Sequence, residues 1–267
     1  MTKPNDHLIR GNPADLGITV IGCSGTYSSA DSSCSSYLVR TTSTTVLLDA
    51  GPGSSIELQR HVDLADVDAI IVSHEHPDHW TELPSLYHAY RFGLDRSHVR
   101  LYGTAGTRSL LDASVVEATE RTFDWTTIDE SSTLEVGDIS FSFSLTDHPV
   151  ETLAIRGEAG GMSVAYSADT GPAWSPERFG APVDVLVYEA SLSVDLEDQG
   201  IPHVSGRQAG ERAAAAGVGH LVLTHVPPGE DPYERVAAAS ARFVGPIDAA
   251  VPGRTFSPVA TSRRRSS

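Results

Sequence analysis

Short apolar runs separated by polar turns dominate the first half of the chain. Alternating or β-branched runs broken by Gly and Ser predict strands at Ile18–Ile21, Tyr37–Arg40 and Thr45–Leu48. The uninterrupted apolar run Ala69–Val72 predicts a strand buried on both faces. Helices are expected in the intervening stretches, at Ile56–His61, Glu82–Phe92 and Thr107–Glu120.

The second half repeats this order of strands followed by helices. Strands are predicted at Leu134–Val136, Ile139–Leu145, Leu153–Arg156, Ser163–Ser167, Val183–Tyr188, Leu221–Thr224 and Ala249–Val251. A helix is predicted over Ser205–Ala216, with a capping-box start and Gly217 as its stop, and another over Pro232–Phe243. Two mixed β/α halves without a long linker predict two packed sheets with helices outside, in one domain.

The length supports one large core, since the chain has 267 residues and 40% of them are hydrophobic. We place this domain at residues 17–258, between an N-terminal extension (1–16) and a disordered basic tail (259–267). No run approaches the roughly 20 apolar residues that cross a bilayer, and no membrane association is expected. The N-terminus lacks a secretory pattern, so a cytoplasmic protein is expected.

Charge and cysteine content narrow the chemistry. The net charge is −16, and the one basic run, Arg263–Arg265, lies in the tail. Because phosphate backbones are bound by clustered Lys and Arg, no extended nucleic-acid surface is expected. Cys23 and Cys34 are too far apart for a Cys-x-x-Cys pair and are expected to be buried free thiols.

The strongest chemical signal follows the predicted strand Ala69–Val72 directly. Within six residues it supplies His74, His76, Asp78 and His79. Neutral imidazole and carboxylate groups are good ligands for zinc and similar ions. His74 and His76 alternate as in an extended segment and can share one ion, whereas Asp78 and His79 follow Pro77 and can face another. A solvated polar loop rarely gathers so many ligand types.

Three later predicted strands are each followed by another residue of a type that binds metal ions. His148 follows the predicted strand Ile139–Leu145, Asp169 follows Ser163–Ser167, and His225 follows Leu221–Thr224. Each alone is more often a turn or cap residue. Residues that can bind metal ions follow four predicted strands, and together they indicate a metal centre.

These residues resemble the metallo-β-lactamase superfamily, whose His-x-His-x-Asp-His motif matches His74 to His79. The resemblance spans nearly the whole chain and implies an αββα sandwich of two mixed sheets flanked by helices. It implies two divalent ions, zinc or alternatively manganese. The ligands implied are His74, His76 and His148 for one ion, Asp78, His79 and His225 for the other, and Asp169 as the bridge. Asp49 matches an aspartate that orients the site without ligating.

One branch of the superfamily matches further residues. Glu189 and His203 resemble the Glu and His-x-Ser/Thr elements of ribonuclease Z-like phosphodiesterases. In that branch the Glu steadies the His, which protonates the leaving oxygen. His203 and Glu189 are therefore expected to be catalytic together with Asp78. A surface histidine is the alternative for His203, and a simple helix N-cap is favoured for Ser205.

The segments Ile18–Gly25 and Leu223–Pro228 look closest to actinobacterial, cyclic-nucleotide phosphodiesterase-like members. This resemblance implies hydrolysis of a small phosphodiester such as cyclic AMP, and a homodimer. The main alternative is ribonuclease Z-like tRNA 3′ processing. Such enzymes usually carry a tRNA-gripping arm between the positions of His148 and Asp169, and that interval is short here. A lactamase or other esterase would leave Glu189 and His203 unexplained, and a non-catalytic metal-binding module would need no proton donor.

Overall fold

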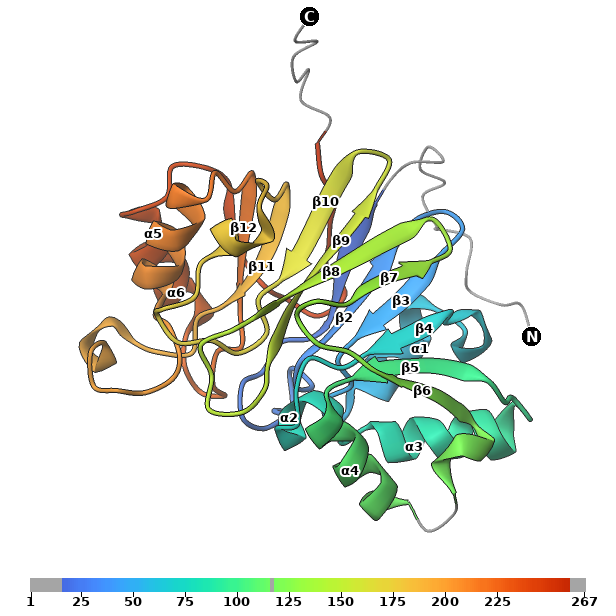
Figure 1. Ribbon diagram of the computed structural model, residues 1–267. Coiled ribbons are helices and arrows are strands. Elements are labelled where there is room, and N and C mark those ends of the chain that lie inside the picture. Colours follow the sequence, from blue (N-terminus) through green and yellow to red (C-terminus); the bar gives the residue numbers. More distant parts are fainter. Residues whose placement is uncertain (1–15, 116–117, 260–267) are drawn as a thin grey trace, which may run out of the picture.

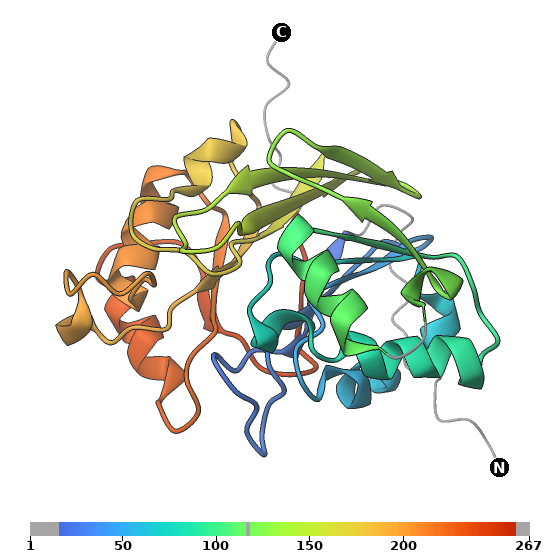
Figure 2. The ribbon, with the colours of Figure 1, turned by 60° about the horizontal axis from the view of Figure 1, so that its bottom comes forward.

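Two β-sheets form the centre of the molecule, a computed structural model that describes residues 16–115 and 118–259. Each sheet has seven strands, and helices cover their outer faces, as Figures 1 and 2 show. The predicted αββα sandwich is thereby confirmed. The proposed extension lies outside the described residues except for Leu16, which is buried in the core. The tail, with Arg263–Arg265, lies outside them except for Val259.

The first sheet has the order β14-β1-β2-β3-β4-β5-β6. Its strands are β1 (Gly17–Gly22), β2 (Ser36–Arg40), β3 (Thr45–Leu48), β4 (Ala69–Ile71), β5 (Val99–Gly103), β6 (Phe123–Thr127) and β14 (Thr255–Phe256). β3, β4, β5 and β6 run parallel. The flanking helices are α1 (Ser54–His61), α2 (Pro77–Trp80), α3 (Leu83–His88) and α4 (Ala105–Ser114), with a π-helical turn, η2 (Ala89–Gly93), after α3.

The second sheet has the order β13-β12-β11-β10-β9-β8-β7. Its strands are β7 (Thr133–Val136), β8 (Ile139–Leu145), β9 (Leu153–Ala159), β10 (Met162–Tyr166), β11 (Val185–Glu189), β12 (His220–Thr224) and β13 (Ile247–Ala249). The strands from β10 to β13 run parallel. Helices α5 (Gly206–Ala215) and α6 (Pro232–Ser240) cover this sheet. Within residues 16–115 and 118–259, no helix is long and apolar enough to span a bilayer.

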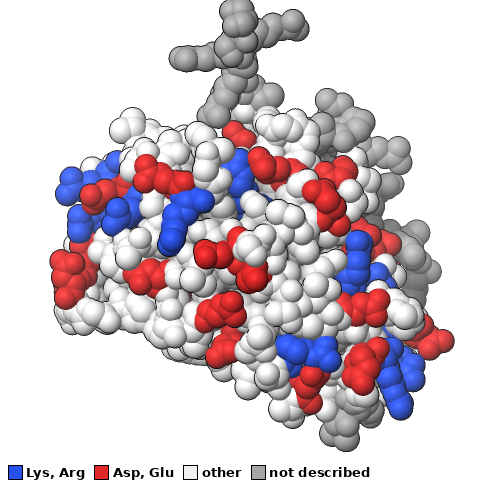
Figure 3. Space-filling view, in the orientation of Figure 1, with Lys and Arg blue, Asp and Glu red and all other residues white. Residues whose placement is uncertain are grey.

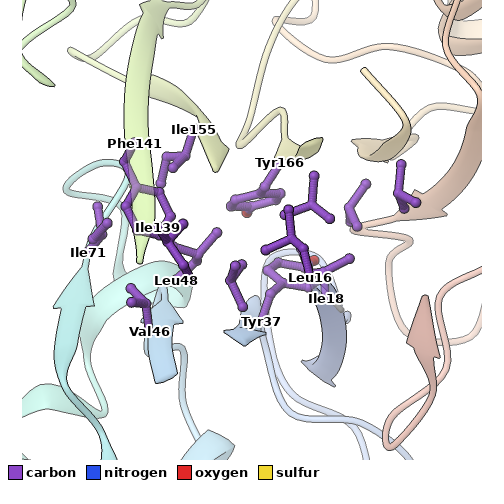
Figure 4. Close-up of a cluster of buried hydrophobic side chains, with 14 of the residues drawn as sticks. Leu16, Ile18, Tyr37, Val46, Leu48, Ile71, Ile139, Phe141, Ile155 and Tyr166 are labelled. Atoms are coloured by element: carbon purple, nitrogen blue, oxygen red, sulfur yellow. The ribbon is translucent and has the colours of Figure 1, made fainter. Parts of the chain in front are cut away.

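The main apolar core lies between the two sheets. Figure 4 shows side chains from both sheets in this layer, among them Val46 and Ile71 of the first sheet and Phe141 and Ile155 of the second. Full burial of one such side chain contributes about 1.5–3 kcal/mol. A polar contact also crosses the layer, because the Tyr37 hydroxyl lies 2.6 Å from the Thr224 hydroxyl. These contacts set how the two sheets face each other.

Several predicted elements need correction. The strands β5, β6 and β14 were not predicted, because β5 and β6 are short runs with polar residues inside them. The helix predicted over Thr107–Glu120 instead begins at Ala105 and ends at Ser114, since Val115 has extended backbone angles. The helix predicted over Pro232–Phe243 ends at Ser240, and β13 lies two residues before its predicted position.

The two cysteines are free, as expected, but only Cys34 is buried. Cys23 is half-buried at the start of the loop between β1 and β2. Burial raises the pKa of Cys34 to about 12, and nearby Asp78 adds to this effect. Its thiol therefore stays protonated at neutral pH.

Candidate metal centre

The parallel strands of both sheets end at one edge of the sandwich, near α2 in Figure 1. Asp49 follows β3, His74 comes three residues after β4, Asp169 follows β10 and His225 follows β12. Carboxyl ends of parallel strands are where α/β proteins bind ligands. Asp49, Ala168 and His225 have positive φ values of 56°, 51° and 60°. Such strained conformations in non-glycine residues concentrate at functional sites.

A short helix delivers two of the predicted ligands. Pro77 begins α2 and His76 is its N-cap, so Asp78 and His79 lie in its single turn. The His79 carbonyl accepts a hydrogen bond from Ala50 N at 2.7 Å, which ties this turn to the end of β3. The predicted turn at Pro77 is therefore a helical turn.

The seven predicted ligands come together in two groups. His74, His76, His148 and Asp169 form one group, and Asp78, His79 and His225 form the other. Within each group the candidate ligand atoms all lie within 4.8 Å of one another. Asp169, the bridge implied by the resemblance, falls in the group of His74, His76 and His148.

Asp169 lies between the two groups. Its Oδ1 is 3.3 Å from His79 Nε2 and 3.4 Å from His225 Nε2. Its Oδ2 is 3.8 Å from His74 Nε2. One carboxylate oxygen thus faces each group, which is the geometry that a bridging ligand needs.

Three polar atoms of this cluster are buried without a hydrogen-bond partner: His74 Nε2, His79 Nε2 and Asp169 Oδ1. A buried polar atom without a partner costs about 1–3 kcal/mol. Imidazole nitrogen and carboxylate oxygen together suit zinc and related divalent ions. The residues present therefore fit a divalent metal centre.

Asp49 orients two of the histidines through one carboxylate oxygen, Oδ2. It accepts hydrogen bonds from His79 Nδ1 at 2.7 Å and from the Ser73 hydroxyl at 2.9 Å. Because the Ser73 proton points to Asp49, the Ser73 oxygen accepts from His74 Nδ1 at 3.0 Å. Both rings then direct Nε2, the atom through which each would bind an ion, at the cluster. This is the orienting contact expected of Asp49.

Ser191 does the same for His225, and sequence analysis missed it. Its hydroxyl donates to the His225 carbonyl at 2.9 Å, so its oxygen accepts from His225 Nδ1 at 2.8 Å. His225 Nε2 faces the cluster and lies 3.1 Å from Asp78 Oδ2. The Ser191 carbonyl is held in turn by buried Arg235 at 3.2 Å. The only sequence signal was a small polar residue two positions after Glu189.

The electrostatics favour ionised Asp169 and Asp78 and a neutral His74. Burial raises the pKa of Asp169, but the neighbouring His225 and His79 outweigh it and hold that pKa well below its usual range. The pKa of Asp78 is also held below its usual range. Burial raises it, but the hydrogen bond to His225 and the charge of His79 outweigh that effect. Burial and the adjacent His79 push the pKa of His74 well below its usual value.

Glu189 and His203 form a hydrogen-bonded pair beside the cluster. His203 Nδ1 lies 2.8 Å from Glu189 Oε1. Glu189, the last residue of β11, is fully buried and also accepts from Thr170 N at 2.7 Å. Burial lowers the pKa of His203, but the Glu189 carboxylate outweighs it and raises that pKa to about 9.

The His203 ring packs against rings of both metal-ligand groups. Its centroid lies 5.5 Å from that of His148 and 5.7 Å from that of His225. Its ligand atom also lies within 4.8 Å of those of Asp169 and His225, so His203 is close enough to be a ligand. Ser205, two residues later, forms the expected capping box of α5 with Gln208.

Comparison with known proteins agrees with this architecture. A family model described as the Beta-lactamase superfamily domain matches residues 44–226. The protein Rv1339 of Mycobacterium tuberculosis is 35% identical over 263 residues, covering 95% of this chain and 96% of that protein. Ribonuclease Z of Mycobacterium bovis is 30% identical over 274 residues, covering 87% of this chain and 95% of that protein.

A solved structure is also similar over most of its length. The metallo-β-lactamase fold protein YhfI of Bacillus subtilis superposes with a TM-score of 0.83 at 26% identity. The match covers 91% of this chain and 99% of YhfI. The chain belongs to the metallo-β-lactamase superfamily. It is a metallo-hydrolase of that fold, with relatives that include ribonuclease Z.

Proposed function

We propose that this protein is a binuclear metal-dependent phosphodiesterase that hydrolyses a small phosphodiester, a 3′,5′-cyclic nucleotide such as cyclic AMP being the favoured substrate. The observation that carries the proposal is the Glu189–His203 pair beside a cluster of seven ligand-type side chains. Cleavage of a phosphodiester with an alkoxide leaving group needs a proton donor, and this pair can supply the proton.

In this proposal His74, His76 and His148 hold one ion, Asp78, His79 and His225 hold the other, and Asp169 faces both. When bound, two divalent ions supply an activated water and neutralise phosphoryl charge. Zinc is favoured and manganese is the alternative, because both accept nitrogen and oxygen ligands. Asp49, Ser73 and Ser191 keep the imidazole Nε2 atoms free for binding.

His203 supplies the proton for the departing ribose oxygen. Its pKa of about 9 keeps the imidazole protonated at neutral pH. Nδ1 is occupied by Glu189, so Nε2 is the atom that donates. Glu189 holds the ring in place and stabilises its charge, and it stays fixed because it is buried and accepts further backbone hydrogen bonds.

The segment between His148 and Asp169 favours a small substrate over tRNA. It is filled by β9 and β10, which pair through a tight turn at Gly160 and Gly161, both with positive φ. This interval therefore has no room for a tRNA-gripping arm. The net charge of −16 points the same way. On the face seen in Figure 3, basic side chains lie among acidic ones without forming a continuous basic stripe.

The test is a substrate panel on metal-loaded protein: cyclic AMP, cyclic GMP, precursor tRNA and a β-lactam. The kcat/KM values are compared at physiological salt. We expect a cyclic nucleotide to be cleaved to its 5′-monophosphate, and precursor tRNA poorly or not at all. Processing of precursor tRNA far above any cyclic nucleotide would overturn the small-substrate assignment and favour the ribonuclease Z-like alternative.

A further inference from the structure

The loop between β1 and β2 rests directly on the second ligand group. Thr26 N donates to Asp78 Oδ2 at 2.8 Å. Gly25 N donates to the carbonyl of Val226 at 3.2 Å, and His225 N donates to the carbonyl of Cys23 at 3.0 Å. Figures 1 and 2 show this blue loop projecting at the edge of the molecule where α2 lies. The position of the loop is thus tied to that of Asp78 and His225.

A glycine makes this close approach possible. A Cβ atom on Gly25 would lie 2.5 Å from the carbonyl oxygen of His225 and 3.2 Å from its Nδ1. Side chains larger than hydrogen would therefore push the loop away from the site. Thr26 is thereby placed against Asp78, and Tyr27 follows it directly in the loop.

The backbone at Thr26, the residue before Tyr27, is strained. Thr26 has a φ of 67°, and Tyr27 N donates to the Gly25 carbonyl at 2.7 Å. A three-residue turn closed in this way around a positive φ is a rare and strained γ-turn. Strain of this kind persists where surrounding structure enforces it, commonly at ligand-binding positions.

Tyr27 itself remains 58% exposed. Five other tyrosines of the described residues are fully or almost fully buried: Tyr37, Tyr87, Tyr90, Tyr166 and Tyr188. Tyr27 is therefore an open aromatic ring on a rigidly anchored loop, two residues from the glycine that packs on His225.

We propose that Tyr27 is a specificity residue whose ring forms the stacking platform for the nucleobase of the substrate. This inference rests on the proposed function, which places the phosphodiester at the metal cluster and the ribose oxygen at His203. His203 stacks on His225, and Gly25 packs on the same His225, so the loop that carries Tyr27 adjoins the residue on which the proposed proton donor stacks. An exposed aromatic face binds any base by stacking, and it needs no basic surface.

The first experiment measures binding, without turnover. Adenosine 5′-monophosphate and ribose 5-phosphate are titrated into zinc-loaded protein by calorimetry, and the two ligands differ only in the base. We expect the nucleotide to bind about 5- to 100-fold more tightly than the sugar phosphate, the usual worth of one base stacked on an aromatic ring. Tyr27→Ala should remove this difference, and Tyr27→Phe should retain it.

Phe92→Ala is the matched control, since Phe92 is an aromatic residue 64% exposed on η2. It should leave both affinities unchanged. Equal binding of the two ligands to the wild-type protein would overturn the proposal that Tyr27 stacks on the base. So would an equal loss for both ligands in Tyr27→Ala, or loss of metal by that variant, because either result would mean that Tyr27 supports the metal site.

The second experiment separates this inference from the proposed function. In the same variants, kcat and KM are measured for cyclic AMP and for its analogue lacking the base. We expect Tyr27→Ala to raise KM for cyclic AMP about 5- to 100-fold and to leave the baseless analogue unaffected. If wild-type protein binds the nucleotide through Tyr27 but cleaves no cyclic nucleotide, the proposed function fails and the base platform stands.

Discussion

The Nδ1 atom of His203 lies 2.8 Å from Oε1 of Glu189, and the two residues differ sharply in exposure. The Glu189 side chain is fully buried, whereas that of His203 is 23% exposed. A buried carboxylate thus holds one nitrogen of an imidazole whose other nitrogen is free. This arrangement stabilises the imidazolium form, which is the form that donates a proton.

His203→Ala tests whether His203 is a proton donor or a metal ligand. As a donor, its loss should lower kcat about 10²–10⁴-fold and leave the metal content unchanged. The loss should shrink for p-nitrophenyl esters, because p-nitrophenolate needs little protonation to leave. An equal loss for both kinds of ester, or release of metal, would assign His203 to metal binding.

Glu189→Gln should shift the pH dependence of kcat/KM. The proposed donor is protonated His203, whose pKa is raised to about 9. The rate therefore falls as pH rises through that pKa. Removing the carboxylate charge lowers the pKa of His203, so this alkaline limb should move to lower pH. A limb that stays in place in Glu189→Gln would show that another group controls it.

Asp78→Ala should abolish turnover and leave a cooperative thermal unfolding transition. Asp78 lies in the short helix α2 beside His225 and makes no part of the apolar core. Its loss should therefore affect the metal site more than the fold. The measurements are kcat/KM and a melting curve on the same sample. Activity within about tenfold of wild type, or ~1.4 kcal/mol of barrier, would exclude Asp78 as a metal ligand.

Elemental analysis of purified protein reloaded with zinc or manganese should find about two divalent ions per chain, as a two-metal site requires. The expectation follows from two ligand groups with Asp169 between them. Chelation should lower the melting temperature, since an ion that binds only the folded state stabilises it. One ion per chain, or none, would contradict the assignment of two sites.

Ser191→Ala should weaken the second metal site about 10- to 100-fold, the usual effect of losing a residue that orients a metal-bound histidine. Without the Ser191 hydroxyl, His225 loses the hydrogen bond that keeps its proton on Nδ1. Metal affinity is measured by competition with a chelator of known strength. Ser240→Ala, on the exposed end of α6, is the control and should change nothing. Unchanged affinity in Ser191→Ala would show that other contacts orient His225.

The sequence by itself determined the architecture and showed which residues of metal-binding type follow the strands. Strands β3 and β8 have the predicted bounds, and the capping box at Ser205 begins α5 as predicted. These features are local, because hydrophobic periodicity and capping depend on neighbouring residues. Ligand-type residues at strand ends were also visible locally, and a sandwich with parallel strands brings such ends together.

Only the tertiary structure decided how those residues are oriented. The contacts of His225 with Asp78, of Ser191 with His225 and of Thr26 with Asp78 join segments 147, 34 and 52 residues apart. No local pattern encodes such pairs, since they depend on how the two sheets pack and where each loop leaves its strand. The protonated nitrogen of each histidine follows from these contacts. So does the position of Tyr27, because the turn that precedes it is held against Asp78 and against Val226 of the other half of the chain.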